Sequence, residues 1–224
     1  MEQTKIRVGN IVLRDEALDY RKKSPVLRFV KRSFDILAAL GTLVCLSWFL
    51  LLIAFLIYIE DGGNPFFVQD RAGKDGKRFR FYKFRSMCVN AEELFAKMQE
   101  QNEQTGNAFK IKDDPRITKI GKFIRKYSID ELPQLINVLK GDMSIVGPRP
   151  ILFHQMEECD EHDRQRLAVR PGLTCIWQIS GRANIKWEQW VELDLKYIRE
   201  MSIWNDIKII LKTIPVVLSG DGAY

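Results

Sequence analysis

The chain has 224 residues, 46% of them hydrophobic, which is enough for one sizeable domain with a packed core. Its formal net charge of +6 favours anionic partners such as phospholipid head groups, phosphorylated substrates or nucleic acid. The four cysteines are scattered and form no CxxC pair, and neither histidine has metal-ligand spacing with them, which argues against a zinc site. Because no recognised nucleic-acid motif is present, we expect no nucleic-acid partner.

A polar lead-in, residues 1–30, precedes one long apolar segment. Residues 36–59 read ILAALGTLVCLSWFLLLIAFLIYI, an uncharged run that exceeds the roughly 18 residues expected of a membrane helix. The run starts too late and is too long for a signal peptide. Because it is apolar on every side, we predict a membrane-embedded helix over residues 31–60 rather than a buried core helix.

The charges around this helix bear on its topology. Lysines and arginines flank both ends, which is a mark of the cytoplasmic side, and the sequence holds no second hydrophobic span. Both features favour a re-entrant helix that enters and leaves the same membrane face, although the length also allows a crossing helix. A re-entrant helix needs a break in its backbone, for which Gly41 and Ser47 are the candidates.

Two short strands are predicted next, at residues 66–69 and 79–84, around a tight turn that contains Asp75-Gly76. The second strand alternates aromatic and basic residues; it includes Lys83 and leads to Arg85. Such a strand either belongs to a half-buried hairpin with a solvated face or turns its basic face toward phosphate. Helices are expected over residues 90–104, 117–126, 131–140 and 152–168.

The last predicted helical region, residues 187–218, contains several amphipathic aromatic side chains. Aromatic residues of this kind are enriched at membrane interfaces, but they also pack in ordinary cores. The sequence leaves both interpretations open for Trp187, Trp190, Tyr197 and Trp204. The interpretation with consequences for function is a helix that lies on the membrane surface.

An acidic pair, Asp130 and Glu131, follows a basic stretch at the start of the predicted helix 131–140. The ordinary interpretation is that Asp130 caps the helix N-terminus, where acids also suit the helix dipole. The basic setting favours a phosphate-handling site, with arginines for phosphate oxygens and a carboxylate for Mg²⁺ or for nucleophilic attack. No Walker loop or GxGxxG motif after a strand is present, so a nucleotide would have to be bound in another way.

Several segments between Lys31 and the C-terminus resemble one known family. They are KRSFDILAAL, FVQDRAGKDGKRFRFYKFRSM, DDPRITKIGKFIRKYSIDELPQLINVLKGDMSIVGPRP, VRPGLTCIWQISGR and the closing stretch that begins LDLKYIREMSIW. The family is the bacterial sugar transferases that act on polyprenyl phosphate, the monotopic phosphoglycosyl transferases. The segment DELPQLINVLKGDMSIVGPRP is long and specific, and the resemblance covers nearly the whole chain.

The resemblance implies an enzyme at the cytoplasmic face of the bacterial inner membrane. Members of the family transfer a sugar 1-phosphate from a UDP-sugar to polyprenyl (undecaprenyl) phosphate and release UMP. This is the first lipid-linked step of a surface glycan such as an exopolysaccharide, a capsule or an O-antigen. The family requires Mg²⁺ and forms a covalent phosphosugar intermediate on the Asp of an acidic dyad. The implied catalytic residues here are Asp130, which is also the candidate metal ligand, and Glu131.

Basic residues would supply the phosphate contacts. The family pattern matches Arg125, five residues before the acidic pair, and Arg149 in the Pro148-Arg149-Pro150 element. Further candidates for substrate or phosphate binding lie in the predicted strand and beside two later turns, and for the turn residues surface charge is an equal alternative. These further candidates are Lys83, Arg85, Arg170 and Arg182.

The expected fold is α+β and mainly helical, with a re-entrant membrane helix, a short β-hairpin and a compact helical catalytic domain over residues 61–224 that carries interfacial helices. The family's re-entrant helix has a Ser-Pro break, whereas Trp48 follows Ser47 here, so the geometry of the break stays open. The expected partners are polyprenyl phosphate, a UDP-sugar and membrane lipids, with homo-oligomer formation left open.

Two questions stay open in the sequence. The alternative to an enzyme is a non-enzymatic, basic, membrane-anchored module that binds anionic lipid or a partner, which would not need the acidic pair. The identity of the sugar cannot be read, although the ending SGDGAY is similar to that of members that transfer galactose or glucose 1-phosphate.

Overall fold

The structure, a computed structural model, describes residues 6–8, 11–13, 24–100, 114–181 and 185–220. Within the predicted lead-in, two three-residue strands, β1 (Ile6–Val8) and β2 (Ile11–Leu13), pair antiparallel. The long apolar helix starts inside the lead-in as well, because Ser24 Oγ accepts a hydrogen bond from Val26 N (3.2 Å) and Pro25 occupies the first helical position.

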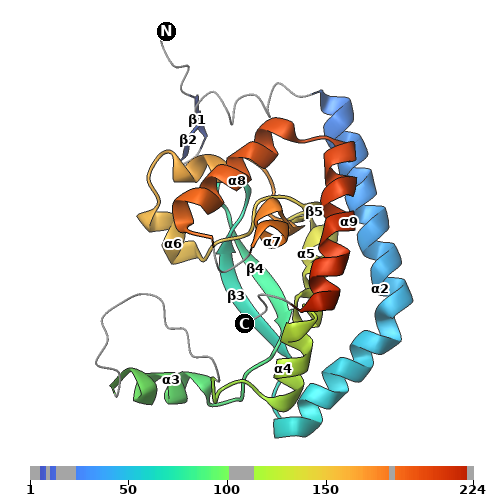
Figure 1. The fold of residues 1–224 in the computed structure, drawn as a ribbon, viewed down its shortest axis with the longest axis vertical. Helices are drawn as coiled ribbons and strands as arrows, with labels where there is room; N and C mark the ends of the chain where they lie inside the picture. Colours follow the sequence, from blue (N-terminus) through green and yellow to red (C-terminus); the bar gives the residue numbers. More distant parts are fainter. Residues whose placement is uncertain (1–5, 9–10, 14–23, 101–113, 182–184, 221–224) are drawn as a thin grey trace.

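The apolar segment forms one continuous helix, α2 (Pro25–Asp61), of 37 residues. At 1.5 Å per residue it is about 55 Å long, and Figure 1 shows it along one whole edge of the molecule. It ends at Gly62, whose φ of 73° suits a glycine cap. The Ser47 hydroxyl donates to Val44 O (2.9 Å) without interrupting the helix, so a full break at the predicted position is absent from the described chain.

The predicted hairpin is confirmed, with a longer first strand. Strand β3 (Phe66–Ala72) pairs antiparallel with β4 (Arg78–Phe84), in a register that runs from Phe66 opposite Phe84 to Ala72 opposite Arg78. The connecting 3₁₀ turn η1 (Lys74–Gly76) contains Asp75 and Gly76 with φ values of 58° and 72°. This left-handed geometry is what an Asp-Gly pair favours.

The inner face of α2 packs on the hairpin and on two short helices, α4 (Lys119–Lys126) and α5 (Gln134–Lys140). One buried cluster joins α2, β4 and α5, and a second joins the C-terminal half of α2 to β4 and α4. The buried members are Ala39, Phe79, Phe81, Leu135, Val138 and Met143 in the first cluster, and Ile53, Ile57, Phe84 and Ile124 in the second. Helix α3 (Ala91–Glu100) begins in the predicted helix 90–104 and follows the hairpin.

A small parallel sheet lies next in the chain. Strand β5 (Ser144–Val146) pairs with β6 (Gly172–Thr174), and the backbone crosses closely just after β5. A Cβ atom on Gly172 would lie 2.1 Å from Gly147 N, so only glycine fits there. This close approach fixes the loop that carries the Pro148-Arg149-Pro150 element.

The single helix predicted over residues 152–168 is wrong. The chain instead forms α6 (Phe153–Glu158) and a 3₁₀ segment, η3 (Asp163–Ala168). Cys159 is extended (φ −66°, ψ 137°), and the Asp160 carboxylate accepts a hydrogen bond from Asp163 N (2.8 Å), which starts the second turn separately.

The C-terminal part consists of α7 (Ile176–Ser180), α8 (Trp187–Glu200) and α9 (Ile203–Ser219). Of the four aromatic residues left open by the sequence, Trp187 and Trp190 pack against the core, and Tyr197 is buried. Only Trp204 is strongly exposed, at 65%. The core interpretation therefore holds for three of the four, and the surface interpretation stays possible only for the start of α9.

Candidate functional site

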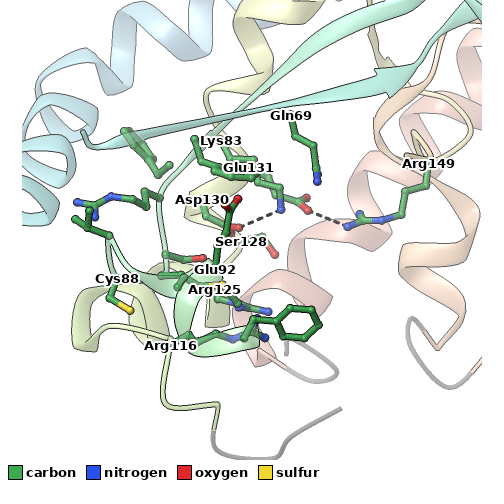
Figure 2. Close-up of a pocket in the computed structure, with 18 of the residues that line it drawn as sticks. Gln69, Lys83, Cys88, Glu92, Arg116, Arg125, Ser128, Asp130, Glu131 and Arg149 are labelled. Atoms are coloured by element: carbon green, nitrogen blue, oxygen red, sulfur yellow. Dashed lines mark hydrogen bonds and ion pairs between the residues drawn. The ribbon is translucent and has the colours of Figure 1, made fainter. Parts of the chain in front are cut away.

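The described residues enclose a cavity of about 810 Å³ between the hairpin, the start of α3, the turn after α4 and helix α7. Figure 2 shows charged side chains converging on it from several of these elements. Six of the eight predicted site residues line it, namely Lys83, Arg85, Arg125, Asp130, Glu131 and Arg149. The other lining side chains used below are Phe67, Gln69, Val89 and Trp177.

Asp130 reaches the cavity from a 3₁₀ turn, η2 (Ile129–Glu131), that precedes α5. The predicted helix start at Glu131 is wrong, because Ser128 has a left-handed backbone (φ 52°) and the backbone bonds that follow span three residues. The regular helix begins only at Gln134, after Pro133. Asp130 therefore does not cap α5. The left-handed Ser128, two residues earlier, precedes the turn from which Asp130 lines the cavity.

The Asp130 carboxylate is 7% exposed, and Lys83 Nζ lies 3.7 Å from its Oδ2 atom. Burial raises the pKa of Asp130 to about 6; Lys83 opposes this shift and Glu131 adds to it. Burial also lowers the pKa of Lys83, against the attraction of Asp130. The nearest cationic partner of Asp130 is therefore a lysine of β4 and not the N-terminus of α5, which the sequence suggests (Figure 2).

The second acid is paired with the Pro-Arg-Pro element, since Arg149 Nη2 donates to Glu131 Oε1 (3.2 Å). The Arg149 guanidinium also lies over the Trp177 ring, 5.0 Å from its centroid. Two other arginines hold the backbone here, because Arg166 Nη2 donates to Arg149 O and Arg71 Nη1 donates to Pro150 O, both at 3.1 Å. The backbone on both sides of the Arg149–Pro150 bond is thus held by buried or half-buried guanidinium groups.

Arg166 was not identified from the sequence. It is 1% exposed, forms a short ion pair with Asp194, and lies over the rings of Trp187 and Trp190. Trp190 in turn stacks on Trp177, at 5.2 Å between ring centroids. The sequence signal was slight, because an arginine in a charged segment usually faces solvent.

The other predicted phosphate contacts have different surroundings. Arg125 lines the cavity. Arg85 also lines it, but its guanidinium forms a two-pronged ion pair with Asp61 at the end of α2, and this hydrogen bonding lowers the pKa of Asp61. Arg170 is not among the lining residues, and its Nε donates to Gly141 O (2.7 Å) at the end of α5. Arg182 lies outside the described residues.

Asn137 of α5 connects this helix to strand β4, and it was also not identified from the sequence. Its side-chain oxygen accepts from Tyr82 N (3.1 Å) and its amide nitrogen donates to Arg80 O (2.6 Å). The side chain therefore continues the hydrogen-bond ladder at the edge of β4 and ties α5 to the strand that carries Lys83. A signal was present, since Asn137 lies between Leu135 and Val138 on the buried face of the helix.

The cavity opens beside apolar surface. Phe67 and Val89 line it and are 42% and 66% exposed. Among the described residues, α2 is the one helix long and apolar enough to cross a membrane, and only 11% of its most apolar window is buried. Large apolar side chains of α2 and α9 face outward, including Phe29, Trp48, Leu51, Phe55, Leu211 and Leu218. These surfaces indicate association with a membrane.

Comparisons with known proteins agree with this arrangement. A family model described as bacterial sugar transferase matches residues 26–220. The chain is 53% identical over 195 residues to the galactosyl transferase CpsE of Streptococcus agalactiae, and 45% identical over 203 residues to the undecaprenyl-phosphate galactose phosphotransferase of Salmonella typhimurium. These matches cover 86% and 88% of this chain but only 43% and 42% of the two relatives.

A third relative has nearly the same length as the matched region. The exopolysaccharide production protein ExoY of Sinorhizobium fredii is 40% identical over 204 residues, which is 89% of this chain and 90% of that protein. The similarity therefore extends over the apolar helix, the hairpin, the acidic pair and the C-terminal helices together.

Proposed function

Because this chain belongs to the bacterial sugar transferase family, we propose that it transfers a sugar 1-phosphate from a UDP-sugar to polyprenyl phosphate and releases UMP. Relatives named undecaprenyl-phosphate galactose phosphotransferase and exopolysaccharide production protein support this reaction and its place at the start of lipid-linked glycan synthesis. The observation that carries the proposal is the buried Asp130 carboxylate, in a cationic cavity that opens beside the apolar surface.

The proposed reaction has two steps. In the first, an Asp130 oxygen attacks the phosphorus that bears the sugar, the bond from this phosphorus to the bridging oxygen breaks, and UMP leaves with that oxygen. In the second, an oxygen of polyprenyl phosphate attacks the same phosphorus and the bond to Asp130 breaks, which restores the carboxylate and yields the polyprenyl diphosphate sugar. A soluble donor and a lipid acceptor can thus use one site in turn.

Each charged neighbour has a role in this scheme. Lys83, Arg149 and Arg125 would neutralise phosphate oxygens as charge moves to the leaving UMP. Glu131, through its ion pair with Arg149, would hold that guanidinium at the phosphate position. The Lys83 contact of 3.7 Å is longer than a hydrogen bond, which leaves the Asp130 oxygens available to a substrate or a cation.

We also propose that Mg²⁺ binds with the donor substrate at Asp130. Among the residues that the structure describes, no cluster of three or more His, Cys, Asp or Glu side chains could hold a metal. Mg²⁺ is commonly held by one or two carboxylates together with substrate phosphates and water, which fits a single accessible Asp130 carboxylate. When bound, the ion would neutralise charge on the transferred phosphoryl group.

For the membrane, we propose that α2 enters and leaves the cytoplasmic face of the inner membrane. Basic residues flank both ends. Both ends of α2 also contact the same domain, through Lys31 and Asp206 near one end and through Asp61 and Arg85 at the other. A helix about 55 Å long that is attached at both ends to one polar domain is poorly suited to crossing a core of about 30 Å.

The direct test is incubation of the protein with a UDP-sugar labelled in the phosphate next to the sugar, with Mg²⁺ and without lipid acceptor. We expect labelled protein, and release of the label to lipid when polyprenyl phosphate is added. Absence of label under conditions where turnover is proven would remove the two-step mechanism. A panel of UDP-sugars, beginning with UDP-galactose because of the names of the relatives, would identify the substrate by UMP release.

A further inference from the structure

Gln69 of β3 has an amide whose orientation is fixed by its neighbour two residues along the strand. Arg71 Nη2 lies 2.9 Å from Gln69 Oε1. Because a guanidinium can only donate hydrogen bonds, the amide atom that faces it must be the oxygen. The two N–H groups of Gln69 therefore point away from Arg71.

Arg71 is itself constrained. Its other terminal nitrogen donates to Pro150 O (3.1 Å), and its guanidinium lies over the Phe81 ring, 5.1 Å from the centroid. Burial, together with the nearby Arg149 charge, lowers the pKa of Arg71 to about 10, which still leaves it charged at neutral pH. An arginine held at three points in this way can keep the Gln69 amide from turning over.

The donor side of the amide faces the cavity. Gln69 lines the cavity, and Figure 2 shows its side chain directed toward the Glu131–Arg149 pair. None of the described residues accepts a hydrogen bond from Gln69 Nε2 in the structure. In the β3–β4 register Gln69 lies opposite Phe81 and Phe67 lies opposite Lys83, so Gln69 projects from the face of the hairpin that carries Lys83.

We propose that the Gln69 amide is a substrate-binding group that donates a hydrogen bond to an oxygen of the sugar 1-phosphate part of the donor nucleotide. Arg71 is the positioning residue that orients it. The substrate class rests on the function proposed above, whereas the oriented donor rests on the Arg71 contact. The oxygen belongs either to the phosphate or to a sugar hydroxyl, since both accept hydrogen bonds from an amide.

The test uses Gln69→Ala, which removes the donor, and Gln69→Glu, which keeps the shape but replaces the donor by a negative oxygen. Asp70→Ala is the matched control, because Asp70 is the next residue on β3, points to the opposite face and is exposed. Calorimetric titrations with UDP and with UDP-galactose, without lipid acceptor, would use the full chain in detergent with Asp130→Asn added to each variant, because the proposed bond between Asp130 and the phosphosugar would otherwise form during the titration. KM and kcat would be measured with Asp130 intact and with polyprenyl phosphate present.

We expect about tenfold weaker binding and a tenfold higher KM for Gln69→Ala, a larger loss for Gln69→Glu, and values like wild type for Asp70→Ala. Weaker binding of both nucleotides assigns the oxygen to the phosphate, and weaker binding of UDP-galactose alone assigns it to the sugar. If both Gln69 variants bind and turn over like wild type, the proposal is overturned.

A double-mutant cycle tests the role of Arg71. Arg71→Lys keeps the charge but cannot bond Gln69 and Pro150 together, so we expect a raised KM in the wild-type background and a smaller effect in the Gln69→Ala background. Independent effects of the two substitutions would overturn the positioning role of Arg71.

The outcomes also distinguish this proposal from the proposed function. A wild-type protein that binds UDP-sugar but shows no transfer would contradict the proposed function. The Gln69 contact could still be measured in that case, by binding alone.

Discussion

Among the described residues, two of the regions that bury carboxylates differ in how those carboxylates are bonded. Near the start of α2, Asp35 accepts hydrogen bonds from Ser144 Oγ (2.8 Å) and Ile145 N (3.0 Å), and Asp206 accepts from Lys31 Nζ (2.6 Å) and Tyr197 Oη (2.9 Å). In the cavity, Asp130 is almost as buried, but its nearest cation is 3.7 Å away.

The difference distinguishes carboxylates that hold structural elements together from a carboxylate that is suited to react. The carboxylates of Asp35 and Asp206, at 2% and 0% exposure, are satisfied by short bonds that join α2 to β5 and α9, and such groups are unreactive because their lone pairs are occupied. The Asp130 carboxylate is close to charge but incompletely bonded, which is the condition expected of a nucleophile. Burial alone would not have distinguished the two regions.

The largest expected effect comes from Asp130→Asn. An amide cannot form the proposed bond to phosphorus, so we expect turnover to fall by at least about 10⁴-fold and the protein labelling to disappear. The measurement is UMP release with polyprenyl phosphate and Mg²⁺. Asp70→Asn makes the same chemical change at an exposed, weakly paired residue and should retain full activity. Activity above a tenth of wild type in Asp130→Asn would remove the nucleophile from this position.

A smaller loss is expected from Lys83→Met, which keeps much of the side-chain length without the charge. Removal of one positioned cation from the transferring phosphate typically lowers the rate by roughly 10²- to 10³-fold. We expect this loss in single-turnover labelling, with unchanged thermal unfolding, because Lys83 makes a cavity contact of 3.7 Å rather than a close structural bond. A large drop in stability with normal labelling per folded molecule would instead place Lys83 with the anchoring groups.

The sequence predicted those features that depend on residues close together in the chain. Three local signals were confirmed: the apolar run forms α2, Asp75-Gly76 lies in the hairpin turn, and the helix predicted to end at residue 140 does end at Lys140. A cationic setting for Asp130 was expected from the basic stretch that precedes it, and Arg125 of that stretch lines the cavity. Arg149, which was expected from the family resemblance, and Lys83, which was a further candidate, line the cavity as well.

Long-range hydrogen bonds could not be predicted in this way. The contact of Asn137 with β4 links residues 55 positions apart, and that of Arg166 with Asp194 links residues 28 positions apart. Neither spacing follows a helix or strand period, so no periodic pattern marks these pairs. The start of α5 was also misjudged, because the left-handed backbone of Ser128 is a tertiary outcome for a residue that usually avoids it.

The anchoring region can be tested through stability. Asp35→Ala would leave the Ser144 hydroxyl and Ile145 N–H buried without their acceptor, which we expect to lower the free energy of unfolding by about 2–3 kcal/mol. For a chain of this size that corresponds to a Tm about 5–10 °C lower in the same detergent. Asp35→Asn retains one acceptor oxygen and should lose less. Equal losses in the two variants would show that charge, rather than the hydrogen bonds, provides the anchor.

The smallest expected effect is on the pH dependence of labelling, which tests directly whether Asp130, unlike Asp35 and Asp206, is free to react. Burial raises the pKa of Asp130 to about 6, and only the ionised form can attack phosphorus. The initial rate at a UDP-sugar concentration well below KM reports the free enzyme, and it should therefore level off well above pH 6 and fall about tenfold per pH unit well below it. Labelling without acceptor avoids the titration of the lipid phosphate monoester, whose second pKa is also near 6. Since Lys83 lowers the pKa of Asp130, Lys83→Met should move this midpoint to higher pH, and an unmoved midpoint would mean that another group controls the rate.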